Sequence, residues 1–327
     1  MFSEIAVFPF ALGIVLAGAK TWQKIPNAPY PEILINGLFL GFLFIGAMAT
    51  KAIFFYILFL FMLPYLFRII SFLRSKSFDH ALRSIFFLFI TLSVAMLFMH
   101  SMKSLNAHYN GRYIYTPNGA RNLYGITNLR TDNLTKQRLQ ESFEITPGAE
   151  LILFLEDNVN KKIVELKNQG VPKEDIDSRL VNLSLKKVAT HPFRFSLFYT
   201  ATGLKMLFWE STKTGFVIYP LWLDKIFSFT PFAIGLKFTM PILVLAGLLY
   251  GVYFIWINRK EMFCRQGPEV SHAILSGNIL LLIFTFNLLH ACFLVLPRFI
   301  FPVAPLYLIL ISFAFDRVLL TKKKSLD

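Results

Sequence analysis

Long uninterrupted apolar runs constrain this chain more than any other feature of its sequence. Their lengths approach the roughly 20 residues that an α-helix needs to cross a bilayer. Because the runs are apolar on every side of a helix rather than on one face, they predict membrane-spanning helices. The sequence therefore predicts an all-α polytopic membrane protein with about seven transmembrane helices and one external α-rich segment. The predicted spans are residues 5–19, 33–50, 52–67, 84–99, 239–257, 273–296 and 299–315.

The composition agrees with this class of protein. Hydrophobic residues make up 55% of the chain, charged residues 16%, and the mean hydropathy is +0.57. A net charge of +14 would suggest a nucleic-acid partner in a soluble protein. Here no basic run outside the spans is interleaved with stacking aromatics, so we expect no nucleic acid to bind. The two cysteines, Cys264 and Cys292, have no metal-ligand spacing, and we expect no metal site.

Basic residues predict the orientation of the chain. If seven spans alternate across the membrane, every short basic loop falls on the same side as the C-terminal tail. Lysine and arginine accumulate in cytoplasmic loops, so this side is predicted to be the cytoplasm. The residues concerned are Lys20, Lys24, Arg68, Arg74, Lys76, Arg83, Arg259, Lys260, Arg265, Arg317 and the tail 321–327.

This orientation makes residues 101–237 external, between four N-terminal spans in residues 1–100 and three C-terminal spans with the basic tail in residues 238–327. Residues 103–187 carry 10 of the 19 acidic residues. Within them, one helix is predicted from Ala149 to Gly170 and another over residues 173–190. Residues 193–210 are interrupted by Arg194 and Lys205, so we expect this stretch to lie at the outer interface with Trp209 as an anchor.

Two cations are predicted at the outer surface. Arg298 opens the last span ahead of Pro302 and Pro305, and a charge deep in hydrocarbon costs about 2.5 to 3.5 kcal/mol. It is therefore expected at an interface or in a polar cavity, either as a snorkelling anchor or as a guanidinium that receives a lipid phosphate. Lys51 separates two spans with almost no loop, and the same two interpretations apply to it.

A polar stretch, "YIYTPNGARNLYGITN", follows the fourth span. Asn118-Gly119 is a turn signal, and asparagine, threonine and tyrosine side chains are suited to sugar hydroxyls. The stretch is expected to form a loop, and a purely structural role is the alternative interpretation.

Four stretches in this order resemble a known family. They are "NGLFLGFLFIGAMATKAIFFYILFLFML", "TPNGARNLYGITN", "ATHPFRFSLFYTATGLKMLFWE" and "LPRFIFPVAPLYLIL". Together they resemble the C-terminal portion of the polytopic GT-C glycosyltransferases, specifically bacterial relatives of glycosyltransferase family 39, which include protein mannosyltransferases and the aminoarabinose transferases of lipid A.

The resemblance implies a membrane glycosyltransferase of the cell envelope, in the bacterial inner (plasma) membrane. Its donor substrate would be a polyprenyl-phosphate sugar, with no further cofactor, and its acceptor an external lipid, glycan or protein. The resemblance also implies a site: Lys51 and Arg298 near the donor phosphate, and Asn118, Asn122 and Tyr124 over the cavity.

One departure from the family concerns the catalytic base. The family carries a catalytic carboxylate on its first external loop, ahead of the matched region, and no counterpart is recognised in this sequence. Either the sequence is part of a longer protein, or this relative has lost the base. The catalytic residue is therefore unknown.

Two non-enzymatic alternatives follow from this departure. The first is a membrane subunit that binds a lipid carrier without catalysing transfer. The second, less favoured, is a transporter, which would need broken helices and ionisable groups at mid-membrane. The polar cluster of the sixth span, Asn278, Asn287 and His290, does not share one clean helix face.

Overall fold

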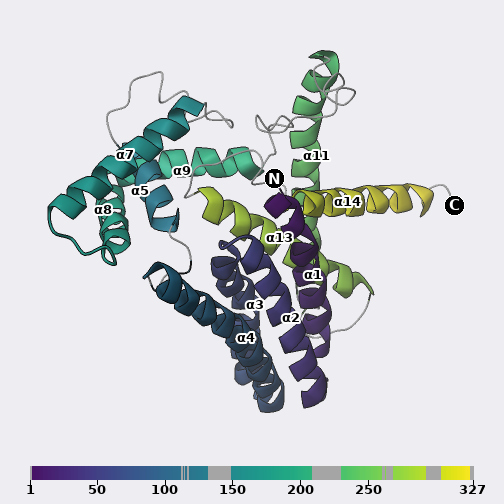
Figure 1. The fold of residues 1–327 in the computed structure, drawn as a ribbon. Helices are drawn as coiled ribbons and strands as arrows, with labels where there is room; N and C mark the ends of the chain where they lie inside the picture. Colours follow the sequence, from purple (N-terminus) through teal and green to yellow (C-terminus); the bar gives the residue numbers. More distant parts are fainter. Residues whose placement is uncertain are drawn as a thin grey trace. The chain divides into compact units, whose positions relative to one another are not determined.

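The structure is a computed structural model. It describes residues 2–111, 113, 115, 118–131, 149–207, 230–259, 262, 268–291 and 303–324. Within these residues the regular structure is α-helical, without β-strands, as Figure 1 shows. The prediction of an all-α chain is confirmed. The helices are α1 (Phe2–Lys24), α2 (Tyr30–Thr50), α3 (Phe54–Arg74), α4 (Phe78–Asn110), α5 (Asn118–Thr131), α7 (Ala149–Asn168), α8 (Ile176–Thr190), α9 (Pro192–Leu207), α11 (Thr230–Asn258), α13 (Pro268–Ala291) and α14 (Ala304–Lys324).

Six helices among the described residues are long and apolar enough to cross a membrane. They coincide with the first six predicted spans, so the chain is an integral membrane protein. The seventh predicted span begins outside the described residues. Its described part belongs to α14, in which a shorter apolar segment covers Pro305–Asp316. The six candidate spans are Ala6–Lys24, Tyr30–Thr50, Phe54–Arg74, Phe78–Asn110, Thr239–Asn258 and Val270–His290.

The chain divides into two compact units. Unit 1 comprises Met1–His100, Phe238–Phe286 and Ile300–Asp327, and unit 2 comprises Ser101–Lys237 and Asn287–Phe299. That residues 101–237 lie outside the membrane stays a prediction.

Glycines on α2 let the helices of unit 1 pack closely. A Cβ atom added to Gly41 would lie 2.9 Å from Cβ of Val94 on α4, and one added to Gly37 would lie 3.0 Å from a methyl group of Ile90. The Thr91 hydroxyl donates a hydrogen bond to the carbonyl oxygen of Gly37 at 3.3 Å. Small residues that allow such close backbone approach are typical of helix pairs in membranes.

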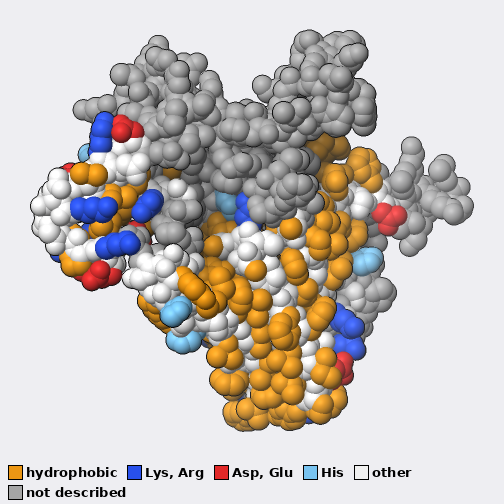
Figure 2. All heavy atoms as spheres, viewed as in Figure 1, with side chains coloured by type: hydrophobic (Ala, Val, Ile, Leu, Met, Phe, Trp, Pro, Cys, Tyr) orange, Lys and Arg blue, Asp and Glu red, His pale blue; other side chains and the backbone are white. Residues whose placement is uncertain are grey.

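The outward surface of unit 1 is apolar. On α2, Phe39 is 56% exposed and Phe42 is 61% exposed. Hydrophobic side chains cover much of the face that α1–α4 present in Figure 2. Lipid tails are the solvent that such a surface requires, because exposed apolar patches of this extent are rare on soluble monomers.

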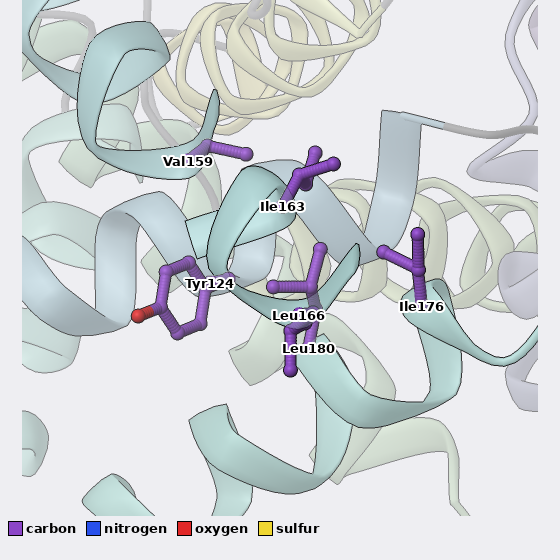
Figure 3. Packing of buried hydrophobic residues seen from close by; sticks show 6 residues of the cluster. All are labelled: Tyr124, Val159, Ile163, Leu166, Ile176 and Leu180. Carbon is purple, nitrogen blue, oxygen red and sulfur yellow. The ribbon is translucent and has the colours of Figure 1, made fainter. Parts of the chain in front are cut away.

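Unit 2 has an apolar core of its own. Gly170, with a φ of 76°, ends α7 in a Schellman motif: its N–H donates to Lys167 O, and the Val171 N–H donates to Leu166 O. The turn brings α8 back against α7 and α5. Figure 3 shows the resulting cluster, whose members are Tyr124, Val159, Ile163, Leu166, Ile176 and Leu180. The two helices predicted in residues 149–190 are confirmed.

Two sequence-based expectations are wrong in detail. Residues from Asn118 form helix α5 rather than a loop, because asparagine also favours helix starts and the α5 side chains Tyr124 and Ile126 are buried. The third predicted span ended at residue 67, ahead of a loop arginine. The helix instead continues to Arg74, and Arg68 is buried inside it with 4% exposure.

Candidate functional site

Lys51 lies at the tight turn between α2 and α3, as predicted. Its backbone N–H donates to Ala47 O at 2.8 Å, and its own carbonyl accepts the Phe54 N–H at 3.0 Å. The Thr50 hydroxyl donates to Ala47 O at 2.8 Å and to Gly46 O at 3.2 Å. These bonds hold the backbone of a half-buried lysine at the C-terminus of a membrane helix, where the helix dipole favours a cation.

The three predicted site residues of α5 differ in their surroundings. Asn118 and Asn122 are one turn apart, and Asn122 is exposed. Tyr124 is 7% exposed, and its ring packs in the cluster of unit 2, so most of its side chain belongs to the core. In Figure 3 its hydroxyl oxygen points away from the aliphatic members of the cluster. A sugar contact by Tyr124 would therefore involve the hydroxyl alone.

The predicted residues are divided between the two units. Lys51 belongs to unit 1, whereas Asn118, Asn122 and Tyr124 belong to unit 2. Arg298 lies outside the described residues. The convergence of these five residues on one cavity stays a prediction.

The sequence analysis did not predict a cluster of aromatic and backbone groups around one buried arginine of unit 1, Arg68. The Arg68 guanidinium lies 4.4 Å from the ring centre of Trp22 and 5.3 Å from that of Phe72, and it donates a hydrogen bond to Trp22 O. The Tyr65 hydroxyl donates to Gly18 O at 2.9 Å, and the Trp22 indole donates to Met262 O at 3.2 Å. These contacts hold the last turn of α1 against α3. The Arg68 guanidinium is stabilised there by the negative end of the α1 dipole and by the aromatic rings.

One signal in the sequence indicates this burial. Arg68 is followed by the apolar residues "IISFL", so the hydrophobic run continues beyond the charge. A charged residue inside an apolar run requires polar or aromatic partners. Trp22 is such a partner. It follows the first predicted span, in the basic loop between Lys20 and Lys24, which was predicted on the same side of the membrane as Arg68.

Glu32 and Asp79 of unit 1 lie far from Lys51. Glu32 pairs with Lys24 at 2.9 Å, and Asp79 pairs with Arg83 at 2.9 Å. Glu32 lies at the start of α2 and Lys51 follows its end, which separates them by roughly 28 Å of helix. Arg83 donates a hydrogen bond to Ala28 O at 2.5 Å, so Asp79 lies at the Glu32 end as well.

Asp316 of α14 also lies at the end opposite Lys51. Phe313, three residues before it, stacks on His272 near the start of α13 at 5.6 Å between ring centres. The Lys51 turn is near the other end of α13, because Phe54 lies 5.9 Å from Phe286. Glu32, Asp79 and Asp316 therefore all lie away from the Lys51 turn.

The described residues contain no group of three or more histidine, cysteine or acidic side chains that would hold a metal ion. Comparisons with protein-family models, curated proteins and solved structures found no match to this chain.

Proposed function

We propose that this chain is a membrane glycosyltransferase of the GT-C type, which transfers a sugar from a polyprenyl-phosphate donor to an external lipid, glycan or protein. The observation that carries the proposal is Lys51, a half-buried cation whose backbone is fixed where two candidate membrane spans meet. A lipid phosphate that enters from the bilayer would bind a cation at the end of a span, and water screens a half-buried charge less than an exposed one. The order of the four family-like stretches supports the same function.

A second candidate is a non-catalytic subunit that binds the lipid carrier. Transfer requires a carboxylate to deprotonate the acceptor hydroxyl, and the catalytic carboxylate of the family has no recognised counterpart in this sequence, which favours this candidate. On this alternative, the chain holds the lipid phosphate and another polypeptide supplies the base.

Binding of polyprenyl phosphate to the full chain in nanodiscs tests what the two candidates share. A charge-assisted hydrogen bond contributes about 1.5 to 3 kcal/mol, so Lys51→Ala should weaken binding roughly 10- to 100-fold. Lys20→Ala is the matched control, because Lys20 is an exposed lysine in unit 1 near the other end of the bundle. Polyprenol without the phosphate should bind equally to both variants. Unchanged phosphate binding in Lys51→Ala would contradict both candidates.

The same nanodiscs separate the candidates when they are given a polyprenyl-phosphate sugar. Release of the sugar onto an acceptor supports the glycosyltransferase. Binding of the donor without transfer supports the subunit. Arg298→Ala should weaken donor binding by the same roughly 10- to 100-fold, and Arg298→Lys should restore only part of it, because a lysine lacks the bidentate fork.

For the location we propose the bacterial inner membrane, with the C-terminus in the cytoplasm and unit 2 outside. The one-sided basic loops support this orientation. An impermeant thiol reagent applied to intact cells should label Asn160→Cys, an exposed position on α7, and should leave native Cys264 unlabelled. Labelling of Cys264 from outside would reverse the orientation.

A further inference from the structure

Helix α9 (Pro192–Leu207) has two apolar faces, and only one of them is packed against the protein. Phe198 is 4% exposed, and the rings of Phe195 and Tyr199 stack with their centres 6.2 Å apart. On the other side, Phe193 is 82% exposed, Leu197 55% and Leu204 48%. At about 100° per residue, these three exposed side chains fall within roughly 40° of one another around the helix axis, and Phe198 lies roughly 100° to 140° away from them.

The packed face ties α9 to the end of a membrane span. The Tyr199 hydroxyl donates a hydrogen bond to Leu288 O at 2.9 Å. Leu288 lies in the last turn of the candidate span Val270–His290, within α13. A helix attached to the last turn of a span lies at the depth of the lipid headgroups, which is where amphipathic interfacial helices are found.

The charge of this region matches an anionic surface. Residues 178–207 contain no aspartate or glutamate. Their basic residues are Arg179, Lys186, Lys187, Arg194 and Lys205. A second copy of the chain would bring this basic stretch against itself, and like charges repel. Anionic headgroups instead offer opposite charge next to an apolar layer, and each nearby lysine or arginine adds to the attraction.

We propose that the face formed by Phe193, Leu197 and Leu204 (the α9 face) inserts into the lipid bilayer, while the basic residues of the stretch 178–207 bind anionic phospholipid headgroups. Unit 2 is thereby held on the membrane surface by α9, independently of any sugar transfer.

Spin labels on the full chain in lipid vesicles test the insertion. In a background of Cys264→Ser and Cys292→Ser, labels are attached at Leu197→Cys or Leu204→Cys, with Lys161→Cys on α7 as the control. Lys161 is exposed and pairs with Asp157 on a charged surface. The ratio of oxygen accessibility to nickel-complex accessibility should be severalfold higher at the two α9 positions than at Lys161. An equal ratio at all three positions would overturn the proposal, and so would protection of the α9 labels from both reagents, which indicates a protein partner.

The headgroup preference is tested with the same labelled protein. Vesicles of phosphatidylcholine are compared with vesicles of phosphatidylcholine and phosphatidylglycerol. The α9 labels should lie deeper in the anionic vesicles, and high salt should reduce the difference. Lys186→Gln combined with Arg194→Gln should remove most of it while the Lys161 label is unaffected. Equal depth in the two lipid mixtures would overturn the anionic preference.

Discussion

The two units of this protein are both α-helical, but they differ in the polarity of their outward-facing side chains and in the residues that make their internal contacts. In unit 1, the helix surfaces that face outward are aromatic and aliphatic, such as Phe39 and Phe42, and the close contacts are made by glycines. In unit 2, α7 and α8 turn charged side chains outward, such as Lys161 and Glu165, and bury aliphatic ones. Glycine-mediated helix contacts are typical of packing in lipid, and a buried aliphatic core under a charged surface is typical of packing in water.

The largest expected effect comes from the core of unit 2. Leu180 of α8 is fully buried among α5 and α7 side chains, so Leu180→Ala should destabilise unit 2 by about 2 to 5 kcal/mol. Hydrogen exchange of the α5, α7 and α8 amides should accelerate, while exchange in α2 should not change. The matched control on the same helix is Leu185→Ala, because Leu185 is 58% exposed. Equal destabilisation by the two variants would mean that Leu180 is not part of a packed hydrophobic core in unit 2.

Close packing in unit 1 gives the next effect. A Cβ at Gly41 would lie 2.9 Å from two carbon atoms of Val94 and 3.3 Å from Thr91 O, so Gly41→Ala should destabilise unit 1 by about 1 to 3 kcal/mol. Gly277→Ala is the control, because its nearest neighbour would be the Ile255 methyl group at an ordinary 3.7 Å. Thermal unfolding in detergent measures both. A Gly41→Ala variant as stable as Gly277→Ala would show that α2 and α4 are not closely packed.

Several features of unit 1 were predictable from the sequence. Apolar runs locate the six candidate spans, because a helix that crosses a bilayer must be apolar over roughly 20 residues. Lys51 was predicted at a turn because two such runs meet there, and the structure has it at the α2–α3 turn. What Lys51 binds stays a prediction.

Other features depend on contacts between residues far apart in the sequence. Arg68 resembles a loop residue until Trp22, 46 positions earlier, supplies a carbonyl and an aromatic face. Asn118-Gly119 resembles a turn, but burial of Tyr124 against α7 and α8 favours a helix from that point. Local preference is ambiguous in both places, and tertiary packing decides between the alternatives.

The smallest effect is expected at the charged surface of unit 2. Glu165 accepts hydrogen bonds from Lys162 at 2.6 Å and from Gln169 at 3.2 Å. The Lys162 bond is the main reason why the pKa of Glu165 lies below its ordinary value of 4.5. A carboxylate whose pKa is lower in the folded state stabilises that state above the unfolded pKa. The contribution is lost as the pH falls through the lowered pKa.

Carboxyl carbon NMR titration of the full chain should therefore give Glu165 a pKa below 4.5, and Lys162→Met should return it towards 4.5. Gln169→Ala should move it less, because the amide carries no charge. The stability of α7 should hardly change in Lys162→Met, since exposed ion pairs are screened by water. A large loss of stability would mean that this surface is shielded from water. The contrast between the apolar outward surface of unit 1 and the charged surface of α7 would then fail.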